Sequence, residues 1–267
     1  MSAVESMPFK TLAQERGRSA AVLDVKGLGL RYPNGKQALT GADLAVTPGE
    51  FVVILGSNGS GKSTMLRCIV RMLEPTDGRI DVAGHDMIRL RGRALRRARM
   101  TIGMIGQQAN LVRRRSVLAN VVSGALARNT TAATAIGLLP ADERTAGLEC
   151  LSHVGLAALA RQRADTLSGG QAQRVAIARA LMQRPKLMLA DEPVASLDPE
   201  ASAEVMRLLR RLADEGLAVA CVLHQPELAR RYADRVVGLA DGRIRFESRA
   251  DSLSAADIAQ LYERRAA

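Results

Sequence analysis

The chain has 267 residues, of which 47% are hydrophobic, so it can form one large domain with a substantial core. Lysine and arginine outnumber aspartate and glutamate by 38 to 27, and the resulting net charge of +11 favours phosphorylated ligands, anionic lipid headgroups or polyanions as partners. Aromatic residues make up only 2% and tryptophan is absent, which argues against stacking of single-stranded bases and therefore against nucleic acid as a partner.

The first residues and the cysteines exclude further classes. Residues 1–20 contain no apolar stretch of signal-peptide length, so they are predicted to be a flexible extension. Cys68, Cys150 and Cys221 are odd in number and far apart, which indicates reduced thiols of a cytoplasmic protein rather than disulfides or a zinc site. No apolar run approaches the roughly 20 residues that a membrane-spanning helix needs, so any membrane role must come through partners.

Strands and helices are predicted to alternate along the chain. Apolar, β-branched runs predict strands at 21–32, 50–55, 186–191 and 218–223. Apolar residues at helical spacing predict helices at 62–73 and 169–183, the second ending before Pro185. This alternation is typical of an α/β fold, with a mostly parallel sheet that helices cover on both faces.

Two segments depart from this alternation. Residues 106–165 are rich in alanine and leucine, and are predicted to be helical throughout and to form a lobe inserted into an α/β domain that spans residues 21–248. Residues 249–267 are predicted to form a C-terminal helical tail. Its Ile258, Leu261 and Tyr262 recur at helical spacing, which core packing alone could explain.

The stretch "ILGSNGSGKST" at 54–64 leads from an apolar strand into glycines, a lysine and hydroxyls. It contains G-x-x-x-x-G-K-[ST] directly after a predicted strand, a pattern that binds nucleoside triphosphates. The residues predicted to contact the nucleotide here are Gly56, Ser57, Asn58, Gly59, Ser60, Gly61, Lys62, Ser63 and Thr64. Backbone N–H groups of the loop would converge on phosphate oxygens at a helix N-terminus. Lys62 would neutralise the outer phosphates, Ser63 would join the ligands of magnesium, and Thr64 would support the loop through its backbone. An ordinary glycine-rich turn is the alternative, and the complete motif disfavours it.

The strand "LMLADEP" at 187–193 ends in two acids. Asp191 is predicted to hold magnesium through water, and Glu192 to orient or deprotonate an attacking water. Two solvated acids at a strand end are the alternative. That reading is disfavoured because the same chain carries a phosphate-binding loop.

A second anion site is predicted at "LSGGQ", residues 167–171. Ser168 and Gln171 have the spacing of a capping box, and the paired glycines Gly169 and Gly170 expose amides of the first helical turn. A plain capped helix would explain Ser168 and Gln171 but not the paired glycines. One chain would thus carry two anion sites for one type of ligand.

In their order along residues 22–248, these motifs resemble the nucleotide-binding subunits of ATP-binding cassette (ABC) transporters. "LSGGQ" looks like the family's signature, and "ASLD" at 195–198 looks like its D-loop, with Asp198 at the nucleotide. Gln107 in "IGMIGQQANL" resembles the Q-loop glutamine. The flanking "MIG" favours it over the adjacent Gln108. His224 falls where the family has its switch histidine.

Tyr32 in "LRYPNG" looks like the aromatic residue that stacks on adenine in this family, although it could also be a plain strand-end aromatic. The chain departs from the family at Gly106, where an aromatic residue is common, and this departure would loosen the Q-loop.

The resemblance implies the fold of a P-loop NTPase core, with an inserted helical subdomain and a small N-terminal antiparallel β region. It also implies a head-to-tail dimer in which each ATP lies between one copy's phosphate loop and the other copy's signature helix. Magnesium ligands would come from Ser63, Gln107 and Asp191, and catalysis from Glu192, His224 and Gln107.

"ADEPVASLDP", "QQANLVRRRSVLANVV" and "SAADIAQLYERR" resemble the phosphonate-import ATPases within that family. The resemblance implies an ATP-hydrolysing subunit at the cytoplasmic face of the inner membrane, attached to two integral-membrane permease subunits and indirectly to a solute-binding protein. The alternatives are an accessory ATPase of a phosphonate-degrading complex, or a motor for another solute such as an amino acid. The basic runs at 89–99 and 113–115 could meet lipid headgroups or permease loops, or could simply be solvated.

Overall fold

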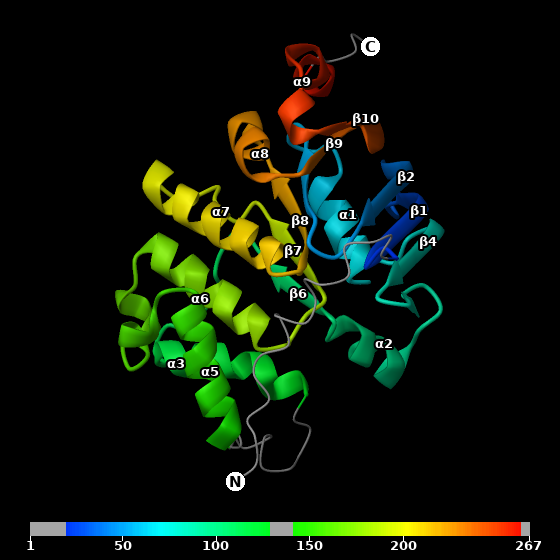
Figure 1. The fold of residues 1–267 in the computed structure, drawn as a ribbon. Coiled ribbons are helices and arrows are strands. Elements are labelled where there is room, and N and C mark those ends of the chain that lie inside the picture. The colour runs from blue at the N-terminus through cyan, green and yellow to red at the C-terminus, as the bar shows by residue number, and fades with distance from the viewer. Residues whose placement is uncertain (1–19, 129–140, 263–267) are drawn as a thin grey trace.

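The computed structural model describes residues 20–128 and 141–262, and the predicted extension at 1–20 therefore lies almost wholly outside the described residues (Figure 1). A six-stranded sheet has the order β10-β9-β3-β8-β7-β6. Its strands are β3 (Phe51–Leu55), β6 (Ile102–Ile105), β7 (Leu187–Asp191), β8 (Ala218–Leu223), β9 (Arg235–Ala240) and β10 (Arg243–Arg249). All neighbours pair in parallel except β10, which is antiparallel to β9. Every residue of β3 and β8 is buried, as expected for parallel strands covered on both faces.

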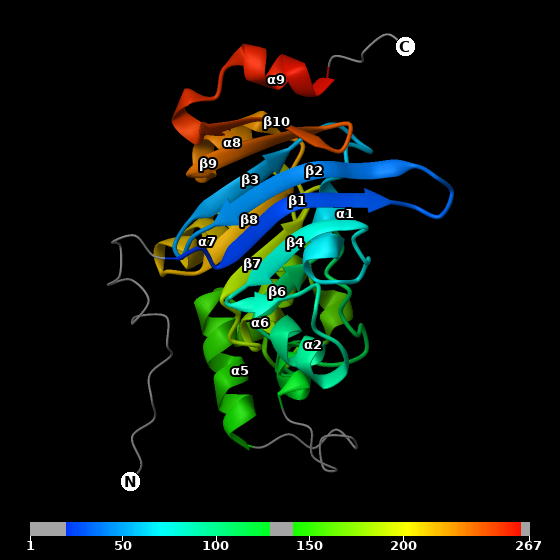
Figure 2. The same ribbon diagram turned by 90° about the vertical axis from the view of Figure 1, so that its right-hand side faces the viewer.

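A smaller antiparallel sheet lies beside the first, as Figure 2 shows, and has the order β2-β1-β4-β5. Its strands are β1 (Leu23–Arg31), β2 (Gln37–Val46), β4 (Asp77–Val82) and β5 (His85–Asp86). Helix α1 (Lys62–Ile69) shares one hydrophobic core with this sheet and with one face of the larger sheet. The expected P-loop NTPase core and N-terminal antiparallel region are both confirmed.

The other face of the larger sheet carries α6 (Gly169–Leu181), α7 (Pro199–Asp214) and α8 (Pro226–Tyr232), which contribute to a second core. In Figure 1, α7 and α8 lie on one side of β7 and β8, and α1 lies on the other. Below them, α3 (Val117–Val122), η3 (Ser123–Ala127) and α5 (Ala141–His153) form a helical lobe, followed by η4 (Ala157–Leu159) and η5 (Ala164–Thr166). Because α6 packs against both α3 and α5, it connects this lobe to the sheet.

The prediction that 106–165 is helical throughout is wrong for its first part, because residues 106–116 form a loop, and residues 129–140 of that segment lie outside the described residues. Contacts with neighbouring helices hold this loop in place of helical hydrogen bonds. The Arg179 guanidinium donates to the carbonyl oxygens of Ala109 and Asn110, each at 2.8 Å. The Asn120 side-chain oxygen accepts from the Val112 amide at 2.7 Å. The loop that follows β6 is therefore fixed to α3 and α6.

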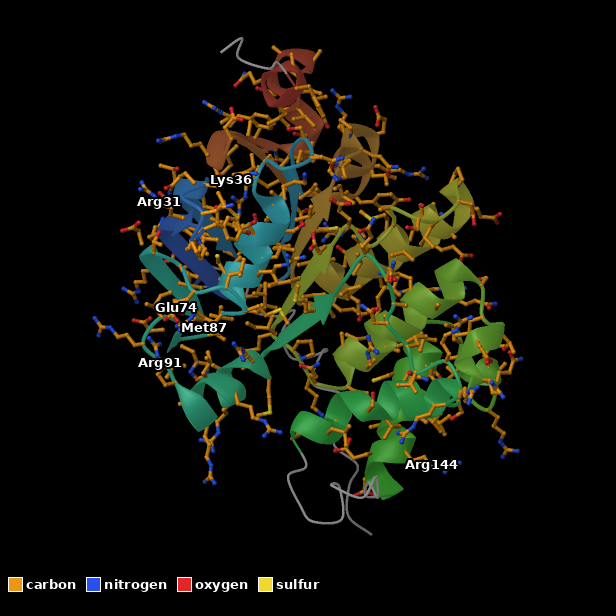
Figure 3. The ribbon with its side chains drawn as sticks, turned by 180° about the vertical axis from the view of Figure 1, so that it is seen from behind. Arg31, Lys36, Glu74, Met87, Arg91 and Arg144 are labelled. Carbon is orange, nitrogen blue, oxygen red and sulfur yellow. The ribbon has the colours of Figure 1, made fainter. Side chains whose placement is uncertain are left out.

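The helix predicted at 62–73 ends four residues early, at Ile69. Arg71 adopts a left-handed φ of 56°, which no helix continues. Its buried guanidinium donates to the carbonyl oxygens of Met87 and Ile88, and its other nitrogen lies 3.0 Å from Glu74. Figure 3 shows Glu74 and Met87 beside Arg91, which also pairs with Glu74. A buried arginine therefore turns the chain away from the helix.

The remaining helices are α2 (Gly92–Arg99), η6 (Ala250–Ser252) and α9 (Ala255–Tyr262). In the C-terminal tail Leu261 is buried, Ile258 packs against the core, and Tyr262 is 46% exposed, so helical spacing overstated the packing of Tyr262. Within residues 20–128 and 141–262, no helix is both long and apolar enough to cross a bilayer.

Candidate functional site

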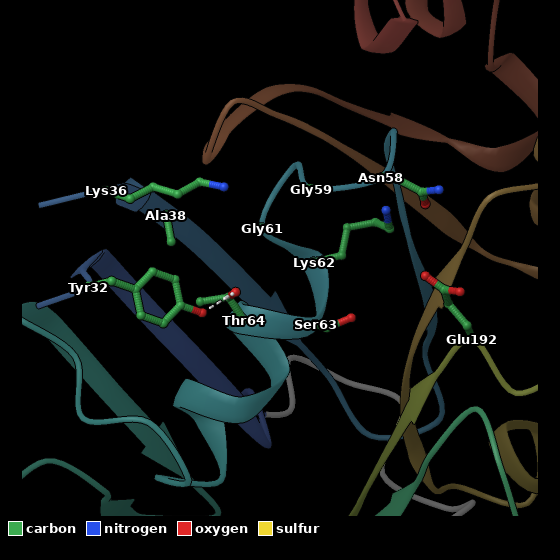
Figure 4. Close-up of a pocket in the computed structure, with 10 residues that line it drawn as sticks. All are labelled: Tyr32, Lys36, Ala38, Asn58, Gly59, Gly61, Lys62, Ser63, Thr64 and Glu192. Carbon is green, nitrogen blue, oxygen red and sulfur yellow. Dashed lines mark hydrogen bonds between the residues drawn. The ribbon is translucent and has the colours of Figure 1, made fainter. Parts of the chain in front are cut away.

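A cavity of about 240 Å³ opens between the β1–β2 hairpin and the start of α1 (Figure 4). Its lining consists of Tyr32, Lys36, Ala38, Asn58, Gly59, Gly61, Lys62, Ser63, Thr64 and Glu192. Eight of these ten were predicted from the sequence. Lys36 and Ala38 were not predicted, and the sequence feature that could have indicated them is that they follow Tyr32 closely in the same hairpin. At 3.1 Å, the Tyr32 hydroxyl shares a hydrogen bond with the Thr64 hydroxyl, which ties the hairpin to α1.

Two glycines of the loop are required by close approach of the backbone. A Cβ at Gly56 would lie 2.2 Å from the Leu239 carbonyl oxygen. At Gly61, where φ is 109°, a Cβ would lie 2.7 Å from the Ala38 carbonyl oxygen. No side chain fits at either distance, so the folded loop itself excludes larger residues there.

Lys62 is buried beneath this loop, with 4% of its surface exposed. Its ammonium donates to the carbonyl oxygens of Gly56 at 2.9 Å and Ser57 at 2.8 Å. Burial lowers the pKa of Lys62, and the nearby charges of Glu192 and Asp191 partly oppose that shift. The loop thus holds a cation at the edge of the cavity, where Figure 4 shows Lys62 and Glu192 directed toward the same space.

Ser63 and Asp191 meet across 128 residues of chain, since the Ser63 hydroxyl donates to Oδ1 of Asp191 at 2.8 Å. Among the described residues there is no group of three or more acidic, histidine or cysteine side chains that could form a metal site by itself. Magnesium is usually bound through one or two carboxylates together with phosphates of the substrate. A hydroxyl beside one carboxylate at the phosphate loop therefore fits magnesium bound jointly with a nucleotide.

Glu192 adopts a left-handed φ of 51°, a strained geometry for a residue with a side chain. Its Oε1 lies 2.5 Å from Nε2 of His224, whose Nδ1 lies 3.1 Å from the Gly56 carbonyl oxygen. A carbonyl oxygen can only accept, so Nδ1 of His224 donates to Gly56, and Nε2 faces the Glu192 carboxylate. The two side chains thus form one acid–base pair beside the cavity.

Gln107 lies exposed on the loop after β6 and does not line the cavity, and neither does the equally exposed Gln108. Gly106 needs no glycine for steric reasons, since the nearest atom to an added Cβ is 3.6 Å away. Its carbonyl oxygen accepts from Nε2 of Gln173 on α6 at 3.0 Å. Gln173 was not predicted from the sequence as a site residue. Its hydrogen bond anchors the loop that Gly106 was expected to loosen. The sequence feature that could have indicated Gln173 is its position two residues after "LSGGQ".

The capping box at the start of α6 is confirmed. The Gln171 amide donates to Ser168 Oγ at 3.2 Å, and the Ser168 amide donates to the Gln171 side chain at 3.0 Å. Ser168, Gly169 and Gln171 do not line the cavity of their own chain.

The paired glycines were not expected to have a structural explanation, but close packing against α7 explains one of them, Gly170. A Cβ at Gly170 would lie 2.8 Å from Cβ of Ala201. Asp198 is also used structurally, as its carboxylate caps α7 by accepting from the Ala201 amide at 2.9 Å. The predicted residues therefore include one group in and around the cavity and a second at the starts of α6 and α7, while Gln107 lies in neither group.

The tail also reaches the site, because the Tyr262 hydroxyl donates to the His224 carbonyl oxygen at 3.2 Å. Nothing in the spacing of Tyr262 along the chain indicated this contact.

Comparisons with known proteins extend over most of the chain. The family described as "ABC transporter" matches residues 39–195, which include the phosphate loop, Asp191 at the end of β7 and Glu192 directly after it. The phosphonates import ATP-binding protein PhnC 3 of Nostoc sp. is 47% identical over 242 residues, covering 90% of this chain and 92% of that protein. The phosphonates import ATP-binding protein PhnC of Bdellovibrio bacteriovorus is 47% identical over 246 residues, covering 91% and 94%.

Two solved structures are similar in fold and sequence. The dimeric, post-hydrolysis structure of the ATP-binding cassette MJ0796 bound to ADP and Pi has a TM-score of 0.75 at 34% identity, covering 86% of this chain and 100% of that one. The structure of cbiO1 from Clostridium perfringens, part of the ABC transporter complex cbiONQ, has a TM-score of 0.78 at 30% identity, covering 90% and 93%.

Proposed function

The chain belongs to the ABC transporter family, and we propose that it is the ATP-hydrolysing subunit of an importer for phosphonate or a related phosphorus oxyanion. One observation carries the ATPase part of this proposal. Lys62, Ser63 and Glu192 line one cavity, and behind them Ser63 is bonded to Asp191 and Glu192 to His224, although these side chains come from the start of α1, the end of β7 and the end of β8.

ATP would bind with its phosphates on the loop amides and its adenine on Tyr32, whose ring Thr64 fixes to α1. Phosphate oxygens would replace the carbonyl oxygens that now hold the Lys62 ammonium. Ser63 and Asp191 would hold magnesium, with Gln107 as a predicted further ligand, and the ion would neutralise charge on the phosphates.

Glu192 would act as the base that orients and deprotonates water for attack on the terminal phosphate. His224 would stabilise the charge that develops on that phosphate, because it can share a proton with Glu192 and is positioned by the Gly56 carbonyl oxygen. The left-handed backbone of Glu192 supports this assignment, since strain of this kind concentrates at functional sites.

A second copy of the chain would complete the site, with Ser168, Gly169, Gly170, Gln171 and Asp198 of one protomer facing the nucleotide of the other. Two features support the dimer: the exposed, capped start of α6, and the dimeric state of the similar cassette MJ0796. The cargo, the two permease subunits, the solute-binding protein and the location at the cytoplasmic face of the inner membrane follow from kinship with the phosphonate importers.

The ATPase assignment is tested with Glu192→Gln, which removes the base but keeps the shape of the side chain. This variant should bind ATP, form the dimer and hydrolyse ATP at least about a hundredfold more slowly. Glu149→Gln, which changes an exposed acid of α5, is the matched control and should hydrolyse normally. Normal turnover by Glu192→Gln would show that Glu192 is not the base.

The cargo assignment is tested by uptake of phosphonates, phosphite and an amino acid into cells that lack this chain. Loss of phosphonate or phosphite uptake alone, restored by the wild-type gene, is the expected result. Unchanged uptake of every phosphorus compound would reject the cargo. Purification from membranes without any hydrophobic subunit would instead favour an accessory ATPase.

A further inference from the structure

We propose that Ala201 is a positioning residue for ATP hydrolysis, because its methyl group against Gly170 fixes the start of α6 to the start of α7. The exposed Ser168 and the D-loop residue Asp198 would then move as one rigid block when they meet the second copy. This inference rests on the proposed function, since it concerns how that function's second anion site is held in place.

Gly170 is buried against α7, and an added Cβ would lie 2.8 Å from Cβ of Ala201, closer than two such atoms can approach. The backbone does not require glycine there, because Gly170 has no left-handed φ and lies within α6. Helix propensity would in fact favour alanine at this position. The reason for glycine within the folded chain is therefore the space that Ala201 occupies.

Neither side of this contact can yield easily. The capping box of Ser168 and Gln171 fixes the first turn of α6, and the cap from Asp198 to the Ala201 amide fixes the first turn of α7. Two Cβ atoms also have no side-chain rotation that could separate them. A methyl group at Gly170 would therefore push the two helix ends apart.

Further contacts between α6 and the region of α7 lie on both sides of this one. One turn further along α6, the Arg174 guanidinium lies 3.3 Å from the carboxylate of Glu204 on α7. At the other end, a Cβ at Gly169 would lie 3.1 Å from the tip of the Leu197 side chain, which can rotate away. Gly169 is exposed and Gly170 is buried, so the two glycines serve different surfaces.

Two explanations of Gly170 now predict different results. If Gly170 leaves room for a phosphate at the dimer interface, an added methyl group is harmful whatever residue stands at 201. If Gly170 leaves room for Ala201, removing the Ala201 methyl group should restore function. The contact can therefore be tested by a compensating substitution.

The experiment compares Gly170→Ala with the double variant Gly170→Ala/Ala201→Gly. ATP hydrolysis is measured with Glu192 intact, and nucleotide-dependent dimerisation is measured on a Glu192→Gln background. Gly170→Ala should lower kcat by about ten- to a hundredfold, because small misplacements of a catalytic group have effects of this size. ATP binding to the monomer should stay within about twofold, since the phosphate loop is unchanged. Ala201→Gly alone, which leaves a gap between the two helix ends, should lower kcat, whereas in the double variant the methyl group at position 170 fills that gap, so kcat and dimerisation should recover toward the wild-type level.

A matched control is Gly170→Ala/Ala203→Gly, which places the glycine on the same helix α7 but makes no room at Gly170. It should not recover. Full activity of Gly170→Ala, failure of the Ala201→Gly rescue, or equal rescue by Ala203→Gly would each overturn the proposal. If Gly170→Ala does not fold, the Ala201→Gly double variant must still fold and hydrolyse ATP. A wild-type protein without ATPase activity would reject the proposed function instead, and rescue of the melting temperature by Ala201→Gly would then decide the contact.

Discussion

The backbone at Glu192 offers a direct measure of the strain that the site contains. Its φ of 51° places a residue with a side chain in the left-handed region, at a cost of about 1–2 kcal/mol. Glycine adopts this geometry without that cost, but gains about 0.5–1 kcal/mol of conformational freedom in the unfolded chain. A glycine at 192 should therefore stabilise the protein by about 0.5–1 kcal/mol relative to an alanine.

The comparison uses Glu192→Ala and Glu192→Gly, because both lack the carboxylate and its contact with His224, and they differ in a single methyl group. The difference in free energy of unfolding corresponds to about 1–4 °C in melting temperature for a chain of this size. Urea unfolding without nucleotide measures it directly, and neither variant should hydrolyse ATP at an appreciable rate.

The control is the same pair of substitutions at Glu149, an exposed position within α5. There glycine should be less stable than alanine by about 1 kcal/mol, because helical backbone favours alanine. The order of stability should thus reverse between the two positions. Equal stability at 192, or greater stability of the alanine variant, would show that the left-handed backbone is not strained.

Three further predictions concern the nucleotide site. Ser168→Ala should lower the free energy of unfolding by about 1 kcal/mol in urea through loss of the cap, while Ser168→Asn should retain most of it. Burial lowers the pKa of Lys62, so the unfolded chain binds the proton more tightly than the folded chain does. The free energy of unfolding of the wild type should therefore rise relative to that of Lys62→Met as the pH increases toward 10.5. A pH-independent difference in unfolding free energy would contradict this. Tyr32→Ala should weaken ATP binding about 5- to 100-fold through loss of stacking, whereas Tyr32→Phe, which loses only the bond to Thr64, should stay within about fivefold in a binding titration.

The elements that the sequence predicted well are those whose signal is local. Gly56 to Ser63 combine strand, turn and helix start in one short segment, and Ser168 with Gln171 forms a capping box that needs no distant partner. Strands such as 186–191 and 218–223 were evident because buried parallel strands are continuous apolar runs.

The secondary structure predicted from the sequence was wrong where a distant side chain competes with local helix propensity. Arg71 ends α1 early because its guanidinium bonds to carbonyl groups 16 and 17 residues away. The loop at 106–116 is not helical, since Arg179 on α6 takes up carbonyl groups that a helix would have used. Neither partner can be read from the spacing of nearby residues.

The amino-acid sequence alone determined which chemical groups the protein has for a triphosphate, because the loop, the strand-end acids and the helix cap are each written in a few consecutive residues. Tertiary structure decided which of these groups act together. Asp191 reaches Ser63, and His224 reaches Glu192, because β7 and β8 pair in parallel and end at the same edge of the sheet as β3. It also decided that Gly170 faces Ala201, since a contact between two helices depends on how they pack and not on what either sequence contains.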